Sequence, residues 1–328
     1  MFIKLTLDFY AIIYHTAFNK IFYGVLTVMV IFMKKSVSLF LIAAILISVL
    51  SFVIGPAFKF SITDDAYCYV NQKYGEHDRQ VLDLVVPKAP TSEQGLILYI
   101  HGGGWISGDK KAYLDMINHN ASLGYISASI NYRYADGIQV TCEDILDDID
   151  AALSKIKQIC AGYGYDLTKL MVSGLSAGAH LSLMYAYSRA DTAPIKPVAV
   201  VSCAGPTDLT DTNFYTTSYV DDINNMVYKI SGANVTQKPI SACTDALLLA
   251  SPISYVDAKT VPTILCHGVK DDVVPYSNAT TLYELLQKHG VESELIIYPN
   301  SDHGLKSDPD IASYANQAFY IYAERYLN

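Results

Sequence analysis

The chain has 328 residues, of which 51% are hydrophobic and 17% charged, and its formal net charge is −9. After residue 54 the sequence holds 19 basic and 31 acidic side chains, a net charge of −12, without any cluster of Lys and Arg. Such a surface repels nucleic acid and anionic lipid headgroups, so we expect no nucleic-acid partner. The length fits one large α/β domain that follows an N-terminal extension.

The extension, residues 1–58, contains an uncharged apolar run at 36–57. This run reaches the roughly 20 residues that cross a bilayer, and it is longer than the apolar core of most signal peptides. Lysines precede the run and aspartates follow it, a charge order that places the domain after it outside the cytoplasm. We therefore expect an uncleaved membrane anchor with an extracytoplasmic domain, and a cleaved signal with a secreted product is the alternative. Translation from Met33 is an alternative to a start at Met1.

Residues 59–328 alternate short apolar runs with longer helical patterns. The runs are apolar at nearly every position, which is typical of parallel strands that are covered on both faces. They occupy 81–86, 95–101, 125–132, 169–174, 198–204, 263–268 and 294–299. The helical patterns occupy 140–161, 177–189, 277–289 and 311–327. This alternation predicts an α/β domain with a doubly wound, mostly parallel sheet of about eight strands.

One connection, at about 207–258, follows the predicted strand at 198–204, which we count as strand 6 of about eight, and is much longer than the others. It is rich in Asp, Asn, Thr and Tyr. Insertions of this size in compact enzymes usually form lids or binding loops. We therefore expect a lid, with a plain surface loop as the alternative.

The sequence GLSAG at 174–178 ends a predicted strand and begins a predicted helix. In that setting G-x-S-x-G forms a sharp turn that lifts the serine above the sheet edge, and the glycines let the backbones pack closely. The turn also places Ser176 at a helix N-terminus, where the helix dipole favours an oxyanion. We predict that Ser176 is a nucleophile; a plain N-cap serine is the alternative.

The sequence HGGGW at 101–105 also follows a predicted strand. Consecutive glycines leave their backbone N–H groups accessible, and each preorganised donor aimed at a developing oxyanion contributes roughly 3–4 kcal/mol. We predict that Gly103, Gly104 and Ala177 supply the donors of an oxyanion hole. A nucleotide cofactor is not expected, because neither GxxxxGK[ST] nor GxGxxG with a later acidic residue is present.

The general base is predicted by elimination among eight histidines. Only His303 lies in a loop after the last predicted strand, where an imidazole can reach across the sheet edge to Ser176. His101 is expected to form hydrogen bonds within the glycine loop instead. Two adjacent candidates for the acid, Asp271 and Asp272, follow the strand TILCHG. The chain order Ser, Asp, His is that of the triad in α/β-hydrolases.

Metal binding has little support in this sequence, and we expect no metal site. The six cysteines show neither a CxxC motif nor the spacing of Cys and His ligands. Cys203 and Cys266 fall within apolar strands and are expected to be buried, whereas a disulfide among the other four stays open. The acidic residues of the 140–161 helix are expected to form a solvated face rather than a calcium site; they are Glu143, Asp144, Asp147, Asp148 and Asp150.

Taken together, HGGGW, GLSAGAH, HGVKDDVVP and the closing DHG resemble the motifs of α/β-hydrolase esterases related to hormone-sensitive lipase and to the bacterial carboxylesterase or feruloyl-esterase-like group. The resemblance covers about 60–328. It implies that Asp271, four positions before a proline, is the acid of the triad. It further implies a serine hydrolase without a cofactor, which cleaves small-molecule or carbohydrate esters through an acyl-enzyme.

Other functions on the same fold are a peptidase, an arylformamidase and a non-catalytic binding module. The resemblance favours an esterase over a peptidase because Ala177 follows the nucleophile. Predicted export argues against an arylformamidase, and the complete set of triad residues argues against a binding module. The many tyrosines and few large aliphatic residues of the insertion favour a short acyl chain or an acyl group carried by a carbohydrate. The sequence leaves the exact ester and the oligomeric state open.

Overall fold

The computed structural model describes residues 65–216 and 219–328. The predicted membrane segment at 36–57 lies outside these residues and stays a prediction. Among the helices that the structure describes, none is both long and apolar enough to cross a membrane.

Eight strands form one sheet in the order β1-β2-β4-β3-β5-β6-β7-β8. Their bounds are β1 Ala66–Lys73, β2 Val81–Pro87, β3 Gly95–Ile100, β4 Ser127–Ile130, β5 Lys169–Leu175, β6 Lys196–Cys203, β7 Thr263–Gly268 and β8 Ser293–Tyr298. The pairs β1/β2 and β2/β4 are antiparallel, and the remaining pairs are parallel. The mostly parallel sheet of about eight strands is therefore confirmed. Strand β1 was not predicted because it lies at an antiparallel edge, where only part of its surface is buried.

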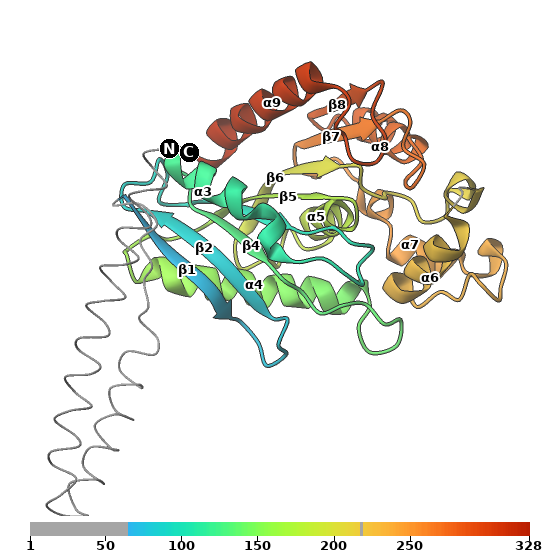
Figure 1. Cartoon of the computed structure of the whole chain (residues 1–328), viewed down its shortest axis with the longest axis horizontal. Helices are drawn as coiled ribbons and strands as arrows, with labels where there is room; N and C mark the ends of the chain where they lie inside the picture. The colour runs from blue at the N-terminus through green and yellow to red at the C-terminus, as the bar shows by residue number, and fades with distance from the viewer. Residues whose placement is uncertain (1–64, 217–218) are drawn as a thin grey trace, which may run out of the picture. The chain divides into compact units, whose positions relative to one another are not determined.

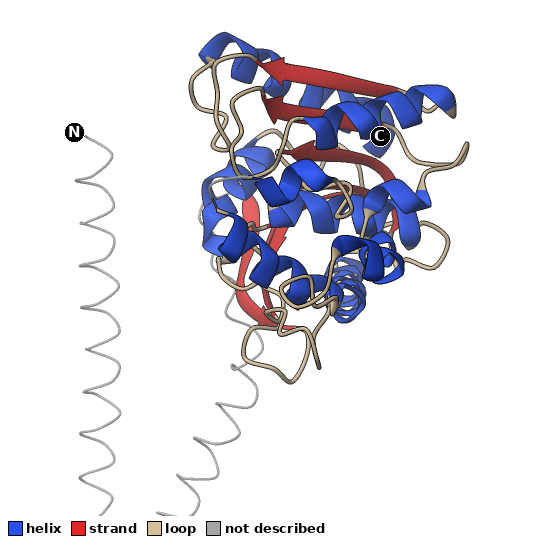
Figure 2. Ribbon diagram, turned by 90° about the vertical axis from the view of Figure 1, so that its right-hand side faces the viewer, coloured by secondary structure: helices blue, strands red, loops and turns tan. Residues whose placement is uncertain are grey.

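Helices cover both faces of this sheet, as the doubly wound prediction requires (Figures 1 and 2). Leu96, Leu98 and Ile100 of β3 belong to a core shared with α4, α5 and α8, whereas Ile97 and Tyr99 belong to a core shared with α3 and α9. The bounds are α3 Leu114–Ser122, α4 Cys142–Ala161, α5 Ala177–Ser188, α8 Ser277–Lys288 and α9 Pro309–Leu327. Because both faces are buried, the strands show the continuous apolar runs of the sequence.

The long connection after β6 is an ordered part of the domain. It consists of η2 Thr212–Thr216, α6 Val220–Ser231, η3 Ile240–Ala242, α7 Thr244–Leu249 and η4 Pro252–Tyr255. Phe214, Ile223 and Leu247 from this insertion join the core that contains α4 and α5. In Figure 1 the arrow of β6 points toward the side where α6 and α7 lie, so the insertion stands beyond the C-terminal end of that strand. Its action as a lid stays a prediction.

The acidic face of α4 is less exposed than expected. Asp148 is 1% exposed, and its Oδ1 lies 2.8 Å from Nη2 of Arg133, in the loop after β4. A second arginine, at the end of α5, forms ion pairs with three more of these carboxylates: Arg189 with Glu143, Asp147 and Asp150. The prediction of a solvated face is wrong for Asp148, because a buried carboxylate is tolerated when a cation and hydrogen bonds compensate it.

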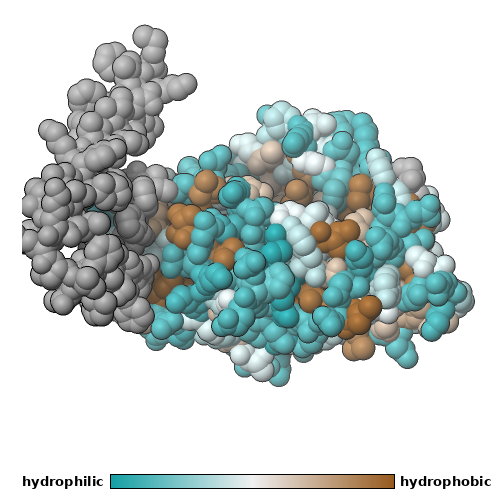
Figure 3. Space-filling model, turned by 60° about the horizontal axis from the view of Figure 1, so that its bottom comes forward, coloured by the Kyte–Doolittle hydropathy of each residue, from teal (hydrophilic) through white to brown (hydrophobic). Residues whose placement is uncertain are grey.

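All six cysteines lie within the described residues, and the free thiols among them include Cys142, Cys160, Cys203, Cys243 and Cys266. Cys203 and Cys266 are neighbours across β6 and β7; the latter is buried and the former is half-buried. The surface in Figure 3 is mainly hydrophilic, with apolar side chains in separate small patches. The apolar residues of the domain are thus gathered inside, on the two faces of the sheet.

Candidate active site

Ser176 lies on the sharp turn between β5 and α5 that the sequence predicted. Its φ is 57° and its ψ is −124°, a strained conformation for a residue that carries a side chain. The turn is held by hydrogen bonds from Ser176 N to Cys203 O (2.8 Å) and from His180 N to Ser176 O (3.0 Å). The surrounding structure therefore fixes the strained backbone and presents the hydroxyl above the sheet.

The two glycines of this turn are required by close backbone packing. A Cβ at Gly174 would lie 2.4 Å from the carbonyl carbon of Gly178. A Cβ at Gly178 would lie 2.0 Å from the carbonyl oxygen of Ile100, at the end of β3. Both distances are far below van der Waals contact, so the approach of α5 to the end of β3 depends on the absence of side chains.

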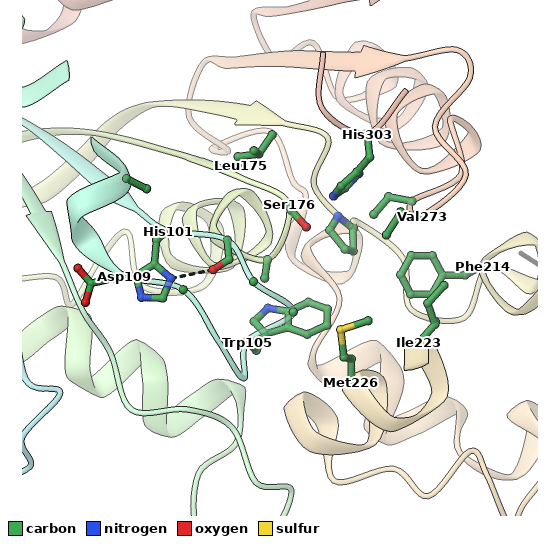
Figure 4. A pocket seen from close by; sticks show the side chains of 18 residues that line it. His101, Trp105, Asp109, Leu175, Ser176, Phe214, Ile223, Met226, Val273 and His303 are labelled. Atoms are coloured by element: carbon green, nitrogen blue, oxygen red, sulfur yellow. Dashed lines mark hydrogen bonds between the residues drawn. The ribbon is translucent and has the colours of Figure 1, made fainter. Parts of the chain in front are cut away.

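His303 and Asp271 form a hydrogen-bonded pair beside Ser176. His303 Nδ1 donates to Asp271 Oδ2 at 2.8 Å. Since a carboxylate only accepts, Nδ1 carries the proton and Nε2 is left as an acceptor. Figure 4 shows the imidazole of His303 directed toward the Ser176 hydroxyl, and both residues line one pocket. Within the described residues no hydrogen bond joins them, and such bonds often tighten only when substrate binds.

Asp271, rather than its neighbour Asp272, lies against this histidine. The Asp271 side chain has no exposed surface, whereas Asp272 is exposed. Burial alone would raise the pKa of the Asp271 carboxyl, but hydrogen bonds from His267, His303 and the backbone outweigh it and hold the pKa well below its ordinary value. Asp271 is therefore ionised, as a partner for an imidazolium must be.

The glycine loop adopts an unusual backbone next to Ser176. Gly103, Gly104 and Trp105 have φ values of 109°, 58° and 63°, and Gly103 O accepts hydrogen bonds from the backbone N–H groups of two later residues in the turn. In the part of the chain that the structure describes, no acceptor contacts the N–H of Gly103 or Gly104. Ala177 is the first residue of α5, where the N–H has no partner within the helix. All three predicted donors line the pocket that contains Ser176.

His101 forms hydrogen bonds within its loop, as expected. Its Nδ1 donates to Gly102 O at 2.7 Å, and its Nε2 accepts from Arg79 Nη2 at 3.1 Å. Arg79 also donates to Gly108 O at 3.2 Å. The arginine comes from the turn between β1 and β2, so sequence motifs did not indicate it.

A second buried histidine connects the glycine loop to the insertion. Trp105 Nε1 donates to His180 Nδ1 at 3.2 Å, and His180 Nε2 lies 2.8 Å from Ala250 O, which accepts its proton. Ala250 directly follows α7. The loop that carries the predicted oxyanion donors is therefore tied through α5 to the insertion.

The burial of His180 predicts that the stability of the protein depends on pH. Burial lowers the pKa of His180 to about 4, so this side chain is neutral in the folded protein and protonated in the unfolded chain below about pH 6.5. Its stabilisation is complete above pH 6.5 and is lost as the pH falls toward 4. Between pH 7 and pH 5, His180 should lower the unfolding free energy of the wild type by about 2 kcal/mol. We expect the His180→Gln variant to lack this contribution.

Urea unfolding at the two pH values measures this difference. His289→Gln, at an exposed position after α8, is the control and should keep the wild-type pH dependence. If the unfolding free energies of the His180 and His289 variants depended on pH in the same way, the buried neutral imidazole of His180 would not be the source of the pH dependence.

The pocket at Ser176 has a volume of about 430 Å³. Beside the serine and histidine, its wall is mainly apolar and consists of Trp105, Phe214, Ile223, Met226 and Val273 (Figure 4). Asp109 lines the opposite side, but its carboxylate points away from Ser176 and accepts from Asn131 Nδ2 at 2.9 Å.

The sequence interpretation missed the part of this wall that comes from the insertion. The signal was nevertheless present in α6, where apolar residues recur at helical spacing: Ile223, Met226, Val227 and Ile230.

The BD-FAE family model matches residues 82–286. The probable carboxylic ester hydrolase LipM of Mycobacterium tuberculosis (strain ATCC 25618 / H37Rv) is 28% identical over 238 residues, which cover 69% of this chain and 52% of LipM. The probable isoprenylcysteine alpha-carbonyl methylesterase ICMEL1 of Arabidopsis thaliana is 24% identical over 242 residues, covering 70% and 49%. The chain thus spans about half the length of the curated relatives it matches.

Solved structures are similar over most of the domain. Esterase B from Lactobacillus Rhamnosis superposes with a TM-score of 0.63 and 18% identity, covering 88% of this chain and 95% of the esterase. A truncated carbohydrate esterase from gut microbiota gives 0.61 and 20%, covering 80% and 99%. These similarities show the α/β-hydrolase fold.

Proposed function

This chain belongs to the BD-FAE family, and from that membership we propose that it is a serine esterase, which hydrolyses carboxylic esters through an acyl-enzyme. The observation that carries the proposal is that Ser176, on its strained turn, lines one pocket with His303, which is hydrogen-bonded to the buried Asp271. The similarity to proteins named as carboxylic ester hydrolases supports it.

In the proposed reaction, the Ser176 hydroxyl attacks the ester carbonyl while His303 Nε2 takes its proton. Asp271 Oδ2 holds the imidazole in the required tautomer and stabilises the imidazolium. The N–H groups of Gly103, Gly104 and Ala177 stabilise the negative oxygen of the tetrahedral intermediate. His303 then returns the proton to the departing alcohol, and a water molecule repeats the sequence on the acyl-enzyme to release the acid.

We propose that the acyl group lies against α6, on the apolar side of the pocket. Phe214, Ile223 and Met226 supply that wall, and within it the structure describes no charged side chain that would favour an ionic acyl group. This environment suits a short or medium uncharged acyl chain, whether the alcohol is a small molecule or a carbohydrate.

Met226 is expected to limit the length of the acyl chain. A Cβ at Gly104 would lie 2.1 Å from Met226 Sδ, so the methionine that lines the pocket packs directly against the glycine loop. Met226→Ala removes this wall and should raise the ratio of kcat/KM for p-nitrophenyl octanoate over acetate by about tenfold. Met116→Ala, on the exposed surface of α3 and outside this pocket, is the matched control. An unchanged ratio in Met226→Ala would place the acyl chain elsewhere.

The reaction class is tested with the full-length protein and matched substrates. A p-nitrophenyl ester, the corresponding p-nitroanilide and an aryl formamide are compared at equal concentration. We expect the ester to be cleaved at least about a hundredfold faster than either amide, because its alcohol is the better leaving group. Faster cleavage of an amide would favour a peptidase or an arylformamidase, and no cleavage of any would favour a binding module.

We further propose that this activity lies outside the cytoplasm, with residues 36–57 as a membrane anchor. The support is the length and flanking charge of that sequence segment alone. Protease treatment of intact cells should degrade the domain, whereas a domain that is cleaved only after lysis would contradict this location.

A further inference from the structure

A second histidine lies at the triad, in addition to His303. His267 is the penultimate residue of β7, is 1% exposed and precedes Asp271 by four residues. Its Nε2 lies 3.0 Å from Val274 O and 3.2 Å from Asp271 Oδ2. Both partners only accept hydrogen bonds, so Nε2 carries the proton and shares it between the backbone and the carboxylate.

The Asp271 carboxylate is enclosed by donors. Oδ2 receives the N–H of His267 and that of His303, and Oδ1 receives the backbone N–H groups of Val273 (2.9 Å) and Val274 (2.8 Å). No part of this side chain is exposed, so water cannot replace a donor that is lost. Any rotation of the carboxylate would therefore leave buried polar atoms without partners, which is costly.

We propose that His267 is a positioning residue, whose N–H holds Asp271 in the rotamer that presents Oδ2 to His303. The inference rests on the proposed function, because His267 acts only through Asp271 and His303. The hydrogen bonds from His267 and His303 also contribute to the lowered pKa of Asp271. A purely structural role would need only the bond to Val274 O, which closes the turn between β7 and α8.

Two isosteric variants separate these roles. Glutamine at position 267 can place an amide N–H near the position of Nε2, whereas methionine has the same length but no donor. We expect His267→Met to lower kcat by about tenfold or more with KM changed less than about twofold, since the lost interaction orients the catalytic groups rather than the substrate. His267→Gln should retain kcat within about threefold of the wild type.

A double-mutant cycle with Asp271→Asn tests the route of the effect. If His267 acts through Asp271, His267→Met should lower kcat by less than about twofold in the Asp271→Asn background. Full additivity, equal losses in the Met and Gln variants, or wild-type kcat in both would each overturn the proposal. Melting temperatures of all variants identify losses that come from unfolding.

The Ser176→Ala variant, measured in parallel, keeps the two proposals apart. If its rate equals that of the wild type, the proposed serine mechanism fails. If Ser176→Ala is inactive while His267→Met is fully active, only the role of His267 fails.

Discussion

Ser176→Ala is expected to lower kcat/KM for p-nitrophenyl butyrate by about 10⁴-fold or more, without loss of the fold. The hydroxyl is the only protein group in the proposed mechanism that bonds to the acyl carbon, and no acyl-enzyme can form without it. The remaining rate should come from the oxyanion donors and from substrate binding, which alone still accelerate such reactions.

A serine at the C-terminal end of α5 provides the control for this variant. Ser188, the last residue of α5, donates its Oγ proton to Met184 O at 2.7 Å and does not line the pocket. Ser188→Ala should therefore keep the wild-type rate. Hydrolysis that survived Ser176→Ala would have to come from another nucleophile and would contradict the assignment of the turn.

Gly178→Ala is expected to destabilise the protein by about 3 kcal/mol or more, or to prevent folding. In most helices the replacement of glycine by alanine stabilises by about 1 kcal/mol. Here the added Cβ would lie 2.0 Å from the carbonyl oxygen of Ile100 and 2.8 Å from the carbonyl carbon of His101. Backbone atoms cannot move aside without separating α5 from β3. Alanine should therefore destabilise the protein at this position, instead of stabilising it.

Urea unfolding of the variants measures this effect. Gly162→Ala is the control, because Gly162 has a φ of −64° at the end of α4 and a Cβ there would approach only Ile159 O, at 3.2 Å. Its unfolding free energy should stay within about 1 kcal/mol of the wild type. A Gly178→Ala variant as stable as Gly162→Ala would show that α5 and β3 are not packed this closely.

Much of the fold was predictable from the sequence because its signals are local. The run TILCHG coincides with β7, since a strand buried on both faces is apolar throughout. Strand β1 and helix α3 were missed for the opposite reason. Strand β1 is half-exposed at the edge of the sheet, and α3 exposes the apolar residues Leu114 and Met116, which weakens its helical pattern.

In the candidate site, too, the residues of local motifs were predictable from the sequence, whereas contacts between distant segments were not. Ser176 and the glycines of the two turns lie in short motifs, where backbone conformation alone restricts the residue type. The contacts of Arg79 with His101 and of Met226 with Gly104 join segments far apart in the sequence. Only the packing of the folded chain brings such residues together, so no pattern along the sequence predicts them.

Covalent labelling is the most direct test of the proposed acyl-enzyme chemistry. The full-length protein is treated with a p-nitrophenyl alkylphosphonate, which reacts with an activated serine and releases p-nitrophenol, and the product is digested and analysed by mass spectrometry. We expect one phosphonyl group per chain on the peptide that contains Ser176, loss of esterase activity in proportion to labelling, and no label in Ser176→Ala. A label on a different residue, or esterase activity that persists after complete labelling of Ser176, would contradict the account.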